Sequence, residues 1–524
     1  MEFLMIAAAG LMQSFCDNLS PNAAPGFLSS LCKNENIATD LGAHLSSAAN
    51  VWLPGSTTFN TATTRWSSLD APGISVVVEV ATENDVAETV KYANANNLPF
   101  LAYNGGHGAI ETLGAIENGI EIWLGKLTSV SIAEDGQTAT FGGGIRSKQV
   151  TDALWAAGKQ TVTGACECTS LLGPGLGGGH GFLQGQYGLI ADQFESLNMV
   201  LANGTQVTVN KDSELWWAVK GAGHNFGIVT SVTSKIYDVQ NDGLWSYKSF
   251  YYTYDKVEEL YNAINRYLGT GKKQAMNLMN YSFFFNYPAI DPNHPVIAFF
   301  ILQQGVGAVE EKYAEPFEKI GPIMSTGGKG TYKDLPTWTS NADDSLPCQK
   351  LGLVNARFPV DLQSYNPSAQ RLAFDAFTNF TQKFPAFNNS LVLFEGYSTQ
   401  GVQNIQADST AFSHREGNLL VTPLIIYPPT DRKRDLQGSR FGEHLRQVLY
   451  HGSGQDEMHS YVNYAFGSEG PEAWYGYEPW RLERLRSLKA KYDPKGRFNF
   501  YAPFDRRKVH SPHYPSRKKV YISN

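Results

Sequence analysis

The chain has 524 residues, with 42 basic and 49 acidic side chains and a formal net charge of −7. No nucleic-acid partner is expected, because phosphate binding needs a clustered basic excess that this composition lacks. Hydrophobic residues make up 42% and charged residues 17% of the chain, which is enough apolar material for a large core and too much for a disordered chain. More than one domain is expected, since single cores stop growing at about 250–300 residues.

The chain contains five cysteines, too few for a disulfide-dense scaffold. Their spacing lacks the paired units of a four-cysteine zinc module, so no metal site is expected. The odd count leaves at least one thiol without a partner in the chain. Cys16 and Cys32 are candidates for one disulfide if the protein is secreted.

The N-terminal sequence does not decide the cellular location of the protein. After Met1-Glu2-Phe3, an apolar run extends through Met12 like the core of a secretory signal, but no basic segment precedes it. Secretion and a cytoplasmic location therefore both remain. No other segment approaches the ~20 apolar residues of a membrane span, so no membrane partner is expected. A secreted glycoprotein would carry glycans at Asn-X-Ser/Thr sequons. These begin at Asn18, Asn203, Asn280, Asn379 and Asn388.

The first half of the chain alternates short strands and helices. A β-branched run predicts a strand over residues 74–80, and the capping-box pattern that begins at Thr82 predicts a helix after it. The pair Asn203-Gly204 lies between two β-rich runs and predicts a hairpin. Further strands are predicted over residues 98–103, 120–124 and 138–141, and a helix over residues 148–157.

The pattern of residue types along the chain changes near residue 241. Aromatic and aliphatic runs predict strands, and two amphipathic stretches predict helices, which together favour a second domain built on an antiparallel sheet. The strands are predicted over residues 279–285, 296–302, 391–397 and 419–427, and the helices over residues 369–384 and 480–492. The basic, proline-containing end, residues 505–524, is expected to be disordered.

Three glycine clusters, each with a Gly-His pair, stand at the ends of predicted elements. Consecutive glycines let a backbone approach a ligand, and their amides can bind a phosphate group. The stretch that begins at Gly173 has GxGxxG spacing but no strand leads directly into it, and no P-loop sequence occurs. A phosphate-bearing cofactor is favoured over a purely structural role. The residues alone do not choose among His107, His180 and His224.

The ordered set of motifs resembles a known family. Asn104-Gly105-Gly106-His107-Gly108 is followed by Cys166 ahead of Gly177-Gly178-Gly179-His180-Gly181, and then by the glycine-rich stretch 223–230. Tyr461-Val462-Asn463-Tyr464 and the stretch 492–499 come last. In this order they resemble the FAD-linked oxidases of the berberine-bridge-enzyme-like group, and within it the fungal branch of secondary metabolism.

This resemblance implies an α+β fold with a two-lobed FAD-binding domain of the p-cresol methylhydroxylase type. A substrate domain with a large antiparallel sheet covered by helices accompanies it. The expected segments are an N-terminal segment 1–65, the FAD-binding domain 66–240, the substrate domain 241–450, a returning segment 451–504 and the tail 505–524.

The resemblance also implies how the cofactor is held. His107 matches the histidine that bonds the 8α position of the flavin, and Cys166 matches the cysteine of a second bond in many members. The Val-Gly that usually follows this cysteine is missing here, which leaves the second bond open, and Cys168 is a weaker candidate for it. The other positions that match FAD contacts are Asn104, Gly105, Gly106, Gly108, Gly173, Gly177, Gly178, Gly227, Val229, Asn463 and Asn499.

For catalysis, the resemblance implies transfer of a hydride from a small organic substrate to flavin N5, with O2 reoxidising the flavin to give H2O2. Tyr464 matches the base of oligosaccharide-oxidising relatives. A tyrosine with a pKa near 10 is a poor base, so Glu395 and Arg415 are candidate tuning partners. The substrate is a polyketide, an alkaloid or a sugar derivative. Oxidation coupled to cyclisation and a non-redox flavoprotein are the alternatives, and the oligomeric state is unknown.

Overall fold

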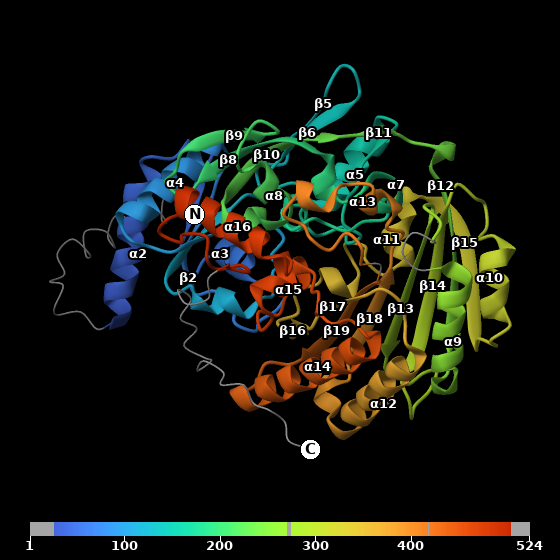
Figure 1. Ribbon diagram of the computed structural model, residues 1–524. Coiled ribbons are helices and arrows are strands. Elements are labelled where there is room, and N and C mark those ends of the chain that lie inside the picture. Colours follow the sequence, from blue (N-terminus) through green and yellow to red (C-terminus); the bar gives the residue numbers. More distant parts are fainter. Residues whose placement is uncertain (1–25, 270–273, 418, 505–524) are drawn as a thin grey trace.

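The computed structural model describes residues 26–269, 274–417 and 419–504 (Figure 1). The signal-like run 1–12, Cys16, Asn18 and the basic tail 505–524 lie outside the described residues. Among the described helices, none is long and apolar enough to cross a membrane. The described chain forms a four-stranded, a five-stranded and a two-stranded sheet in its N-terminal part and one large eight-stranded sheet after them, as an α+β fold requires.

The first sheet has four strands in the order β1-β2-β4-β3, of which β2, β4 and β3 are parallel. Val76, Val77 and Val78 of β2 are fully buried, as is typical of a strand covered on both faces. The predicted capping box is present at Thr82, which starts helix α4. The elements of this lobe are α2 (Gly26–Gly42), β1 (Asn50–Trp52), α3 (Thr57–Thr63), β2 (Ile74–Glu79), α4 (Glu83–Ala95), β3 (Phe100–Tyr103) and β4 (Gly119–Trp123).

The second sheet has five antiparallel strands in the order β5-β6-β10-β8-β9. The predicted hairpin joins β8 to β9, and Gly204 takes φ +83° at its turn, a conformation that favours glycine. The elements are β5 (Val130–Ile132), β6 (Thr138–Gly142), α5 (Ser147–Ala156), β7 (Lys159–Gln160), α6 (Leu172–Gly175), α7 (Gln184–Tyr187), β8 (Phe194–Leu201), β9 (Gln206–Asn210), α8 (Trp216–Ala222), β10 (Gly227–Lys235) and β11 (Tyr237–Asp238).

The third sheet has eight antiparallel strands, and helices α9, α12 and α14 pack on one of its faces (Figure 1). Its order is β15-β12-β14-β13-β18-β19-β16, with β17 paired to β19. The strands are β12 (Leu244–Tyr252), β13 (Leu278–Phe285), β14 (Val296–Gln304), β15 (Met324–Thr331), β16 (Val354–Arg357), β17 (Val360–Leu362), β18 (Leu391–Gly396) and β19 (Leu419–Tyr427). The helices are α9 (Val257–Ala263), α10 (Glu311–Glu318), α11 (Leu335–Trp338), α12 (Pro367–Lys383), α13 (Gln400–Gln403) and α14 (Arg432–Ser453).

The last part of the chain returns to the first lobe. Helices α15 (Pro471–Tyr475) and α16 (Pro479–Tyr492) lead into a segment whose Phe500 carbonyl accepts a 2.8 Å hydrogen bond from the Thr112 hydroxyl. The Tyr475 hydroxyl donates to the carbonyl of Ala502 at 2.7 Å. These contacts close the chain over the first two sheets.

Two features differ from the sequence prediction. The first domain begins well before residue 66, because β1 pairs with β2 and α2 packs beside them. Helix α14 and strand β15 were not predicted. Helix α14 buries only a narrow stripe that includes Phe441, Leu445 and Leu449, and β15 is a glycine-rich edge strand without alternation. Strand β15 lacks the periodic signal on which such predictions rest, whereas α14 carries Phe441, Leu445 and Leu449 at helical spacing, a signal that the sequence analysis did not use.

Candidate functional site

A cavity of about 1180 Å³ lies between the two small sheets and the large one. The loop after β3, the start of β10 and the uncovered face of the large sheet all contribute to its lining. His107, His180 and His224, the histidines of the three glycine clusters, all line it. The motifs singled out in the sequence therefore converge on one space.

His107 stands at one end of the cavity, in the loop that follows β3. Its ring stacks on Trp66 with centroids 5.9 Å apart. Nε2 lies 3.2 Å from the carbonyl oxygen of Pro347, so this nitrogen carries the proton and the lone pair falls on Nδ1. Nδ1 is buried and has no hydrogen-bond partner among the described residues. Burial and the nearby Arg357 lower the pKa of His107 to about 4, which keeps the imidazole neutral at pH 7.

The other two cluster histidines already have side-chain partners. Nδ1 of His180 lies 2.8 Å from the Gln184 side-chain oxygen, and Nε2 of His224 lies 3.2 Å from the Tyr475 hydroxyl. His107 differs because, of these three rings, only its Nδ1 is both buried and without a hydrogen-bond partner among the described residues. This observation favours His107 over the other two histidines.

The residues of the glycine clusters that match FAD contacts divide into two groups. One group lines the cavity and comprises Asn104, Gly105, Gly106, Gly108, Gly173, Gly227 and Val229. Gly177 and Gly178 instead lie beneath the lining. A Cβ on Gly177 would meet the Asn463 side-chain oxygen at 2.3 Å, and one on Gly178 would meet the Phe412 ring at 2.5 Å. Cofactor contact by these two glycines stays a prediction, and in the structure they let Asn463 and Phe412 approach the backbone.

The two asparagines of the closing motif also behave differently. Asn463 lines the cavity, and its Nδ2 donates to the carbonyl of Pro174 at 2.8 Å. Asn499 lies outside the lining, where its side chain stands close to the turn at Gly496. Cofactor contact by Asn499 therefore stays a prediction.

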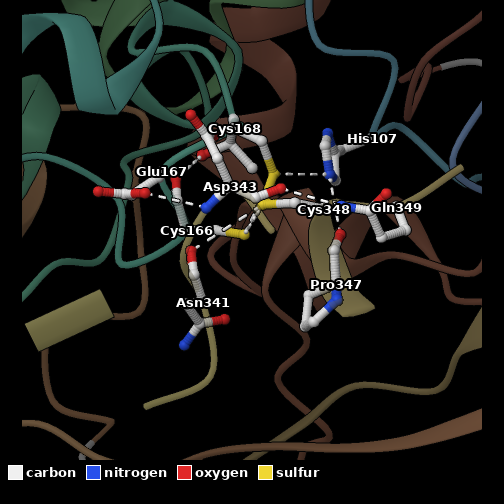
Figure 2. Close-up of a disulfide and its surroundings, with 10 residues drawn as sticks. His107, Cys166, Glu167, Cys168, Asn341, Asp343, Pro347, Cys348 and Gln349 are labelled. Carbon is white, nitrogen blue, oxygen red and sulfur yellow. Dashed lines mark hydrogen bonds between the residues drawn. A yellow bond between two sulfur atoms is a disulfide. The ribbon is translucent and has the colours of Figure 1, made fainter. Parts of the chain in front are cut away.

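A disulfide and a free thiol lie beside His107 (Figure 2). Cys168 is bonded to Cys348, which joins the first domain to segment 339–353 of the substrate domain. Cys166 lines the cavity as a thiol, with Sγ 3.4 Å from Cys348 Sγ. Burial raises its pKa to about 12. Cys168 is excluded as a flavin anchor by its disulfide, whereas Cys166 keeps the position that the sequence indicated.

Tyr464 and Glu395 meet farther along the cavity. The Tyr464 hydroxyl donates to Glu395 Oε1 at 3.0 Å, and the Tyr397 hydroxyl donates to Oε2 at 2.6 Å. Glu395 is 3% exposed, and burial raises its pKa to about 7. Burial and this carboxylate hold the pKa of Tyr464 well above its usual value. The pKa of Tyr464 is thus raised rather than lowered, and the member of the pair whose pKa lies near 7 is Glu395.

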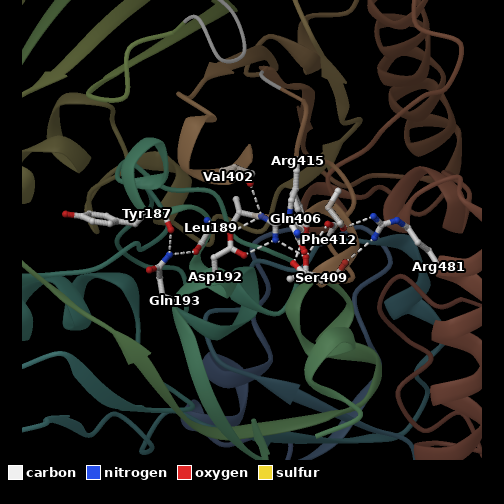
Figure 3. A network of polar contacts seen from close by, with 12 residues as sticks. Tyr187, Leu189, Asp192, Gln193, Val402, Gln406, Ser409, Phe412, Arg415 and Arg481 are labelled. Atoms are coloured by element: carbon white, nitrogen blue, oxygen red, sulfur yellow. Dashed lines mark hydrogen bonds and ion pairs between the residues drawn. The ribbon is translucent and has the colours of Figure 1, made fainter. Parts of the chain in front are cut away.

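Arg415, the other predicted tuning partner, is not among the residues that line the cavity. Figure 3 shows its polar contacts. Its guanidinium makes two hydrogen bonds to Asp192, at 2.8 and 3.0 Å, and a third to Thr410. Arg415 and Asp192 are both almost fully buried. The arginine therefore fixes its loop to the first domain, and its predicted catalytic role is corrected.

A cation that does lie beside the Tyr464–Glu395 pair is Arg357, at the end of β16. It donates to the carbonyl of His107 at 2.6 Å and to that of Asn463 at 3.3 Å. Its guanidinium carbon stands 4.6 Å from the centroid of Trp66 and 5.0 Å from that of Tyr464. Sequence analysis missed it, because a single arginine at the end of a short strand carries no motif.

The large sheet supplies an apolar wall of the cavity, between the Tyr464–Glu395 pair and the outer edge of the cavity. Alternate residues of its strands face the cavity, as strand geometry requires. They are Phe283, Phe285, Phe300, Leu391, Leu393, Leu424 and Ile426. Asn286, Asn388 and Asn389 border this apolar wall at its outer end. This surface suits a flat, largely apolar ligand.

The donor set fits FAD. The cavity is larger than the range of about 300–1,000 Å³ usual for drug-sized ligands, the glycine-rich loop offers backbone amides, and His107 Nδ1 is an unpartnered nitrogen. A two-domain α+β protein with this site is of the flavin-dependent oxidoreductase class.

Comparison with known proteins identifies the family of the chain. Residues 74–210 match a family model described as FAD binding domain, and residues 460–503 match one described as Berberine and berberine like. The FAD-linked oxidoreductase chyH of Penicillium rubens is 51% identical over 464 residues, which cover 88% of this chain and 93% of that protein. The FAD-linked oxidoreductase chry5 of Gibberella zeae is 51% identical over 475 residues, which cover 88% of this chain and 94% of that protein. The chain belongs to the berberine-bridge-enzyme-like family of FAD-linked oxidoreductases.

Solved structures agree on the fold. Physcomitrella patens BBE-like 1 has a TM-score of 0.75 at 19% identity and covers 89% of this chain and 99% of its own. The xylooligosaccharide oxidase from Myceliophthora thermophila C1 has a TM-score of 0.76 at 17% identity, covering 90% and 99%. The α+β fold with a p-cresol methylhydroxylase-type FAD-binding domain is thus confirmed.

Proposed function

We propose that this protein is an oxidase that takes a hydride from a small, flat and largely apolar substrate, with FAD bonded covalently to His107 and O2 as the electron acceptor. The observation that carries the proposal is the Tyr464–Glu395 pair in the same cavity as the unpartnered Nδ1 of His107. The cavity thus offers a nitrogen for the flavin and a pair of side chains for the proton, and Arg357 contacts both His107 and Tyr464.

FAD bound here supplies the hydride acceptor. The neutral imidazole of His107 offers Nδ1 for the bond to the flavin, while the Pro347 carbonyl fixes the opposite nitrogen. Asn104 and the glycines of its loop present backbone groups to the phosphates. Cys166 is the candidate for a second bond, and it must first lose its proton, because its pKa is raised to about 12.

Proton removal uses two side chains. Tyr464 accepts the proton of the substrate hydroxyl or amine as it passes its own proton to Glu395, 3.0 Å away. Glu395, with a pKa of about 7, is the group whose charge state changes in the working range. Tyr397 holds the second carboxylate oxygen and fixes its orientation.

The apolar wall favours an aromatic secondary metabolite such as a polyketide or an alkaloid over a sugar derivative. Sugars need many hydrogen-bond partners, which the seven residues of this wall do not offer, and the polar side chains that also line the cavity, such as Asn286, Asn388 and Thr422, lie around it. Oxidation coupled to cyclisation would use the same residues. A flavoprotein without redox turnover would not need the Tyr464–Glu395 pair.

We also propose a secretory route. The Cys168–Cys348 disulfide is of a kind that persists in oxidising compartments. The sequon asparagines Asn203, Asn379 and Asn388 are exposed, whereas Asn280 is 1% exposed on β13 and is no acceptor in the folded chain. A mass decrease on glycosidase treatment of the protein from its native host supports this route, and an unmodified mass contradicts it.

The oxidase proposal is tested without knowledge of the substrate. The purified yellow protein is reduced with one equivalent of dithionite under nitrogen and then mixed with air-saturated buffer. Full recovery of the flavin colour within seconds, with one H2O2 formed per flavin, supports the proposal. Reduced flavin that persists for minutes in air contradicts it. A panel of aryl alcohols and oligosaccharides, scored by anaerobic bleaching, then separates the substrate classes.

A further inference from the structure

Three cysteine sulfurs contact one another beside His107 (Figure 2). Cys168 and Cys348 form the disulfide, and Cys166 Sγ lies 3.5 Å from Cys168 Sγ and 3.4 Å from Cys348 Sγ. A thiol in contact with both sulfurs of a disulfide has the partners that thiol–disulfide exchange requires. The proposed mechanism gives Cys166 only a bond to the flavin and makes no use of this contact.

The surroundings of the two bonded sulfurs differ, and they favour one direction of exchange. Cys168 Sγ lies 3.5 Å from His107 Nε2, the ring nitrogen that carries the proton. An N–H group at this position stabilises a thiolate that leaves from Cys168. Cys348 Sγ instead lies 3.9 Å from the carbonyl oxygen of Asn341, which offers a thiolate no donor. Attack of Cys166 on Cys348, with Cys168 as the leaving sulfur, is therefore the favoured step.

We propose that the three cysteines are a thiol–disulfide exchange site, in which the cross-link moves between Cys168–Cys348 and Cys166–Cys348. Cys166 stands beside the bond, so a rotation of its side chain first brings its sulfur in line. Cys166 then loses its proton and bonds to Cys348 Sγ, while the Cys168–Cys348 bond breaks and its electron pair goes to Cys168, which takes up a proton. One thiol and one disulfide are present before and after, so the step needs no oxidant or reductant.

The exchange changes which sulfur faces a ligand, a consequence that rests on the proposed function. Cys166 lines the cavity, whereas Cys168 is 7% exposed and is not among the lining residues. With the cross-link on Cys168, the cavity holds a free thiol that can bond the flavin. With the cross-link on Cys166, it holds none. Segment 339–353 stays tied to the first domain in both forms, so the exchange sets the number of flavin bonds without releasing this segment.

The surroundings of Cys166 make the exchange slow at neutral pH. Burial raises the pKa of its thiol to about 12, and only the thiolate attacks a disulfide. The rate should therefore rise about tenfold for each pH unit below this pKa. The groups that act on this thiol are Asp343, Glu167, Arg357, Tyr281 and the backbone of Cys168.

The test follows the position of the free thiol in the purified full chain. The protein is kept in weakly acidic buffer, moved to a series of alkaline buffers without added thiol, and returned to acid after increasing times. The free thiol is alkylated with a maleimide as the chain is unfolded, and digestion in acid prevents further exchange. Tandem mass spectrometry of the peptides locates the alkyl group on either side of Glu167. Cys166→Ser is the matched control, because it keeps the disulfide and lacks the attacking sulfur.

At the start, the alkyl group is expected on Cys166. After incubation, about a tenth or more of it should lie on Cys168, with linked Cys166–Cys348 peptides in the same proportion. The rate of this change should rise with pH. The control variant should show no alkylation of Cys168 or Cys348 at any time.

The inference is overturned if at least about 99% of the alkyl group stays on Cys166 in every buffer. Alkylation that moves to Cys348 instead contradicts the favoured direction, and equal alkylation of Cys168 in the control variant shows that Cys166 is not the attacking group. Flavin bonded to every copy of Cys166 would leave no thiol to exchange and would also overturn it. A protein that holds no FAD but exchanges its disulfide would overturn the proposed function alone.

Discussion

The two walls of the cavity are built in opposite ways. On the FAD-binding side, loops place backbone groups and one histidine, and glycines such as Gly105 and Gly106 let the chain approach a ligand. On the substrate side, the large sheet presents alternate side chains of β18, from Glu395 to Leu391, and Asn388 lies in the loop ahead of that strand. The FAD-binding wall is made of backbone that must fit one cofactor, so it leaves a recognisable motif in the sequence. The substrate wall is made of side chains, which can change with each substrate without disturbing the sheet.

The Tyr464–Glu395 pair joins the two walls, because Tyr464 comes from the returning segment and Glu395 from β18 of the large sheet. The largest expected effect therefore comes from breaking their contact. Tyr464→Phe should slow flavin reduction by ~10²–10⁴ while flavin content stays unchanged. Tyr281→Phe is the matched control, because it removes a hydroxyl that bonds Tyr397 and not Glu395. Rapid-mixing kinetics with a substrate found in the bleaching panel give both rates. Equal rates for Tyr464→Phe and the unaltered protein would remove this residue from the mechanism.

The pH dependence of flavin reduction tests the carboxylate alone. Burial raises the pKa of Glu395 to about 7, so the protonated, inactive form accumulates below that pH. The rate should fall about tenfold for each pH unit below the pKa and level off above it. Glu395→Gln should be slow and lose this inflection. A profile that is unchanged in Glu395→Gln would assign the titration to another group.

The disulfide Cys168–Cys348 ties the two walls together across 180 residues of sequence. Cys348→Ser should lower the free energy of unfolding by about 2–5 kcal/mol, because the open chain gains conformational freedom. Denaturant titration measures the loss. Cys166→Ser, which leaves the disulfide intact, is the control and should change stability by less than about 1 kcal/mol. Equal losses in both variants would show that the tether does not stabilise the pairing of the walls.

The smallest expected effect concerns a glycine beneath the lining. A Cβ on Gly177 would overlap the Asn463 side chain, so Gly177→Ala should cost about 1–3 kcal/mol of stability and loosen the returning segment. Gly307→Ala is a control, since a Cβ at that position would have no described atom within 4 Å. Thermal unfolding of the two variants compares them. A stable Gly177→Ala with unchanged flavin retention would contradict the packing role.

The sequence predicted the FAD side well, since motif spacing around His107, Gly173 and Gly227 reflects backbone requirements that are local in the chain. It also predicted the Tyr464–Glu395 pair as candidates, although not their contact. It missed Arg357, Cys348 and the true setting of Arg415, because each depends on a partner far away in sequence. Asp192 lies 223 residues from Arg415, and Pro347 lies 240 residues from His107. Pairings over such distances are determined by tertiary structure and leave no periodic signal.

The central claim is that FAD is bonded to His107 in this cavity. The most direct measurement is acid denaturation of the purified protein, followed by filtration and peptide mass mapping of any flavin that stays with the polypeptide. The account predicts flavin mass on the His107 peptide, with or without a second bond to Cys166, and flavin released to the filtrate from a His107→Ala and Cys166→Ser double variant. A protein that stays colourless after FAD is added, or flavin fixed to a peptide that contains neither residue, would contradict it.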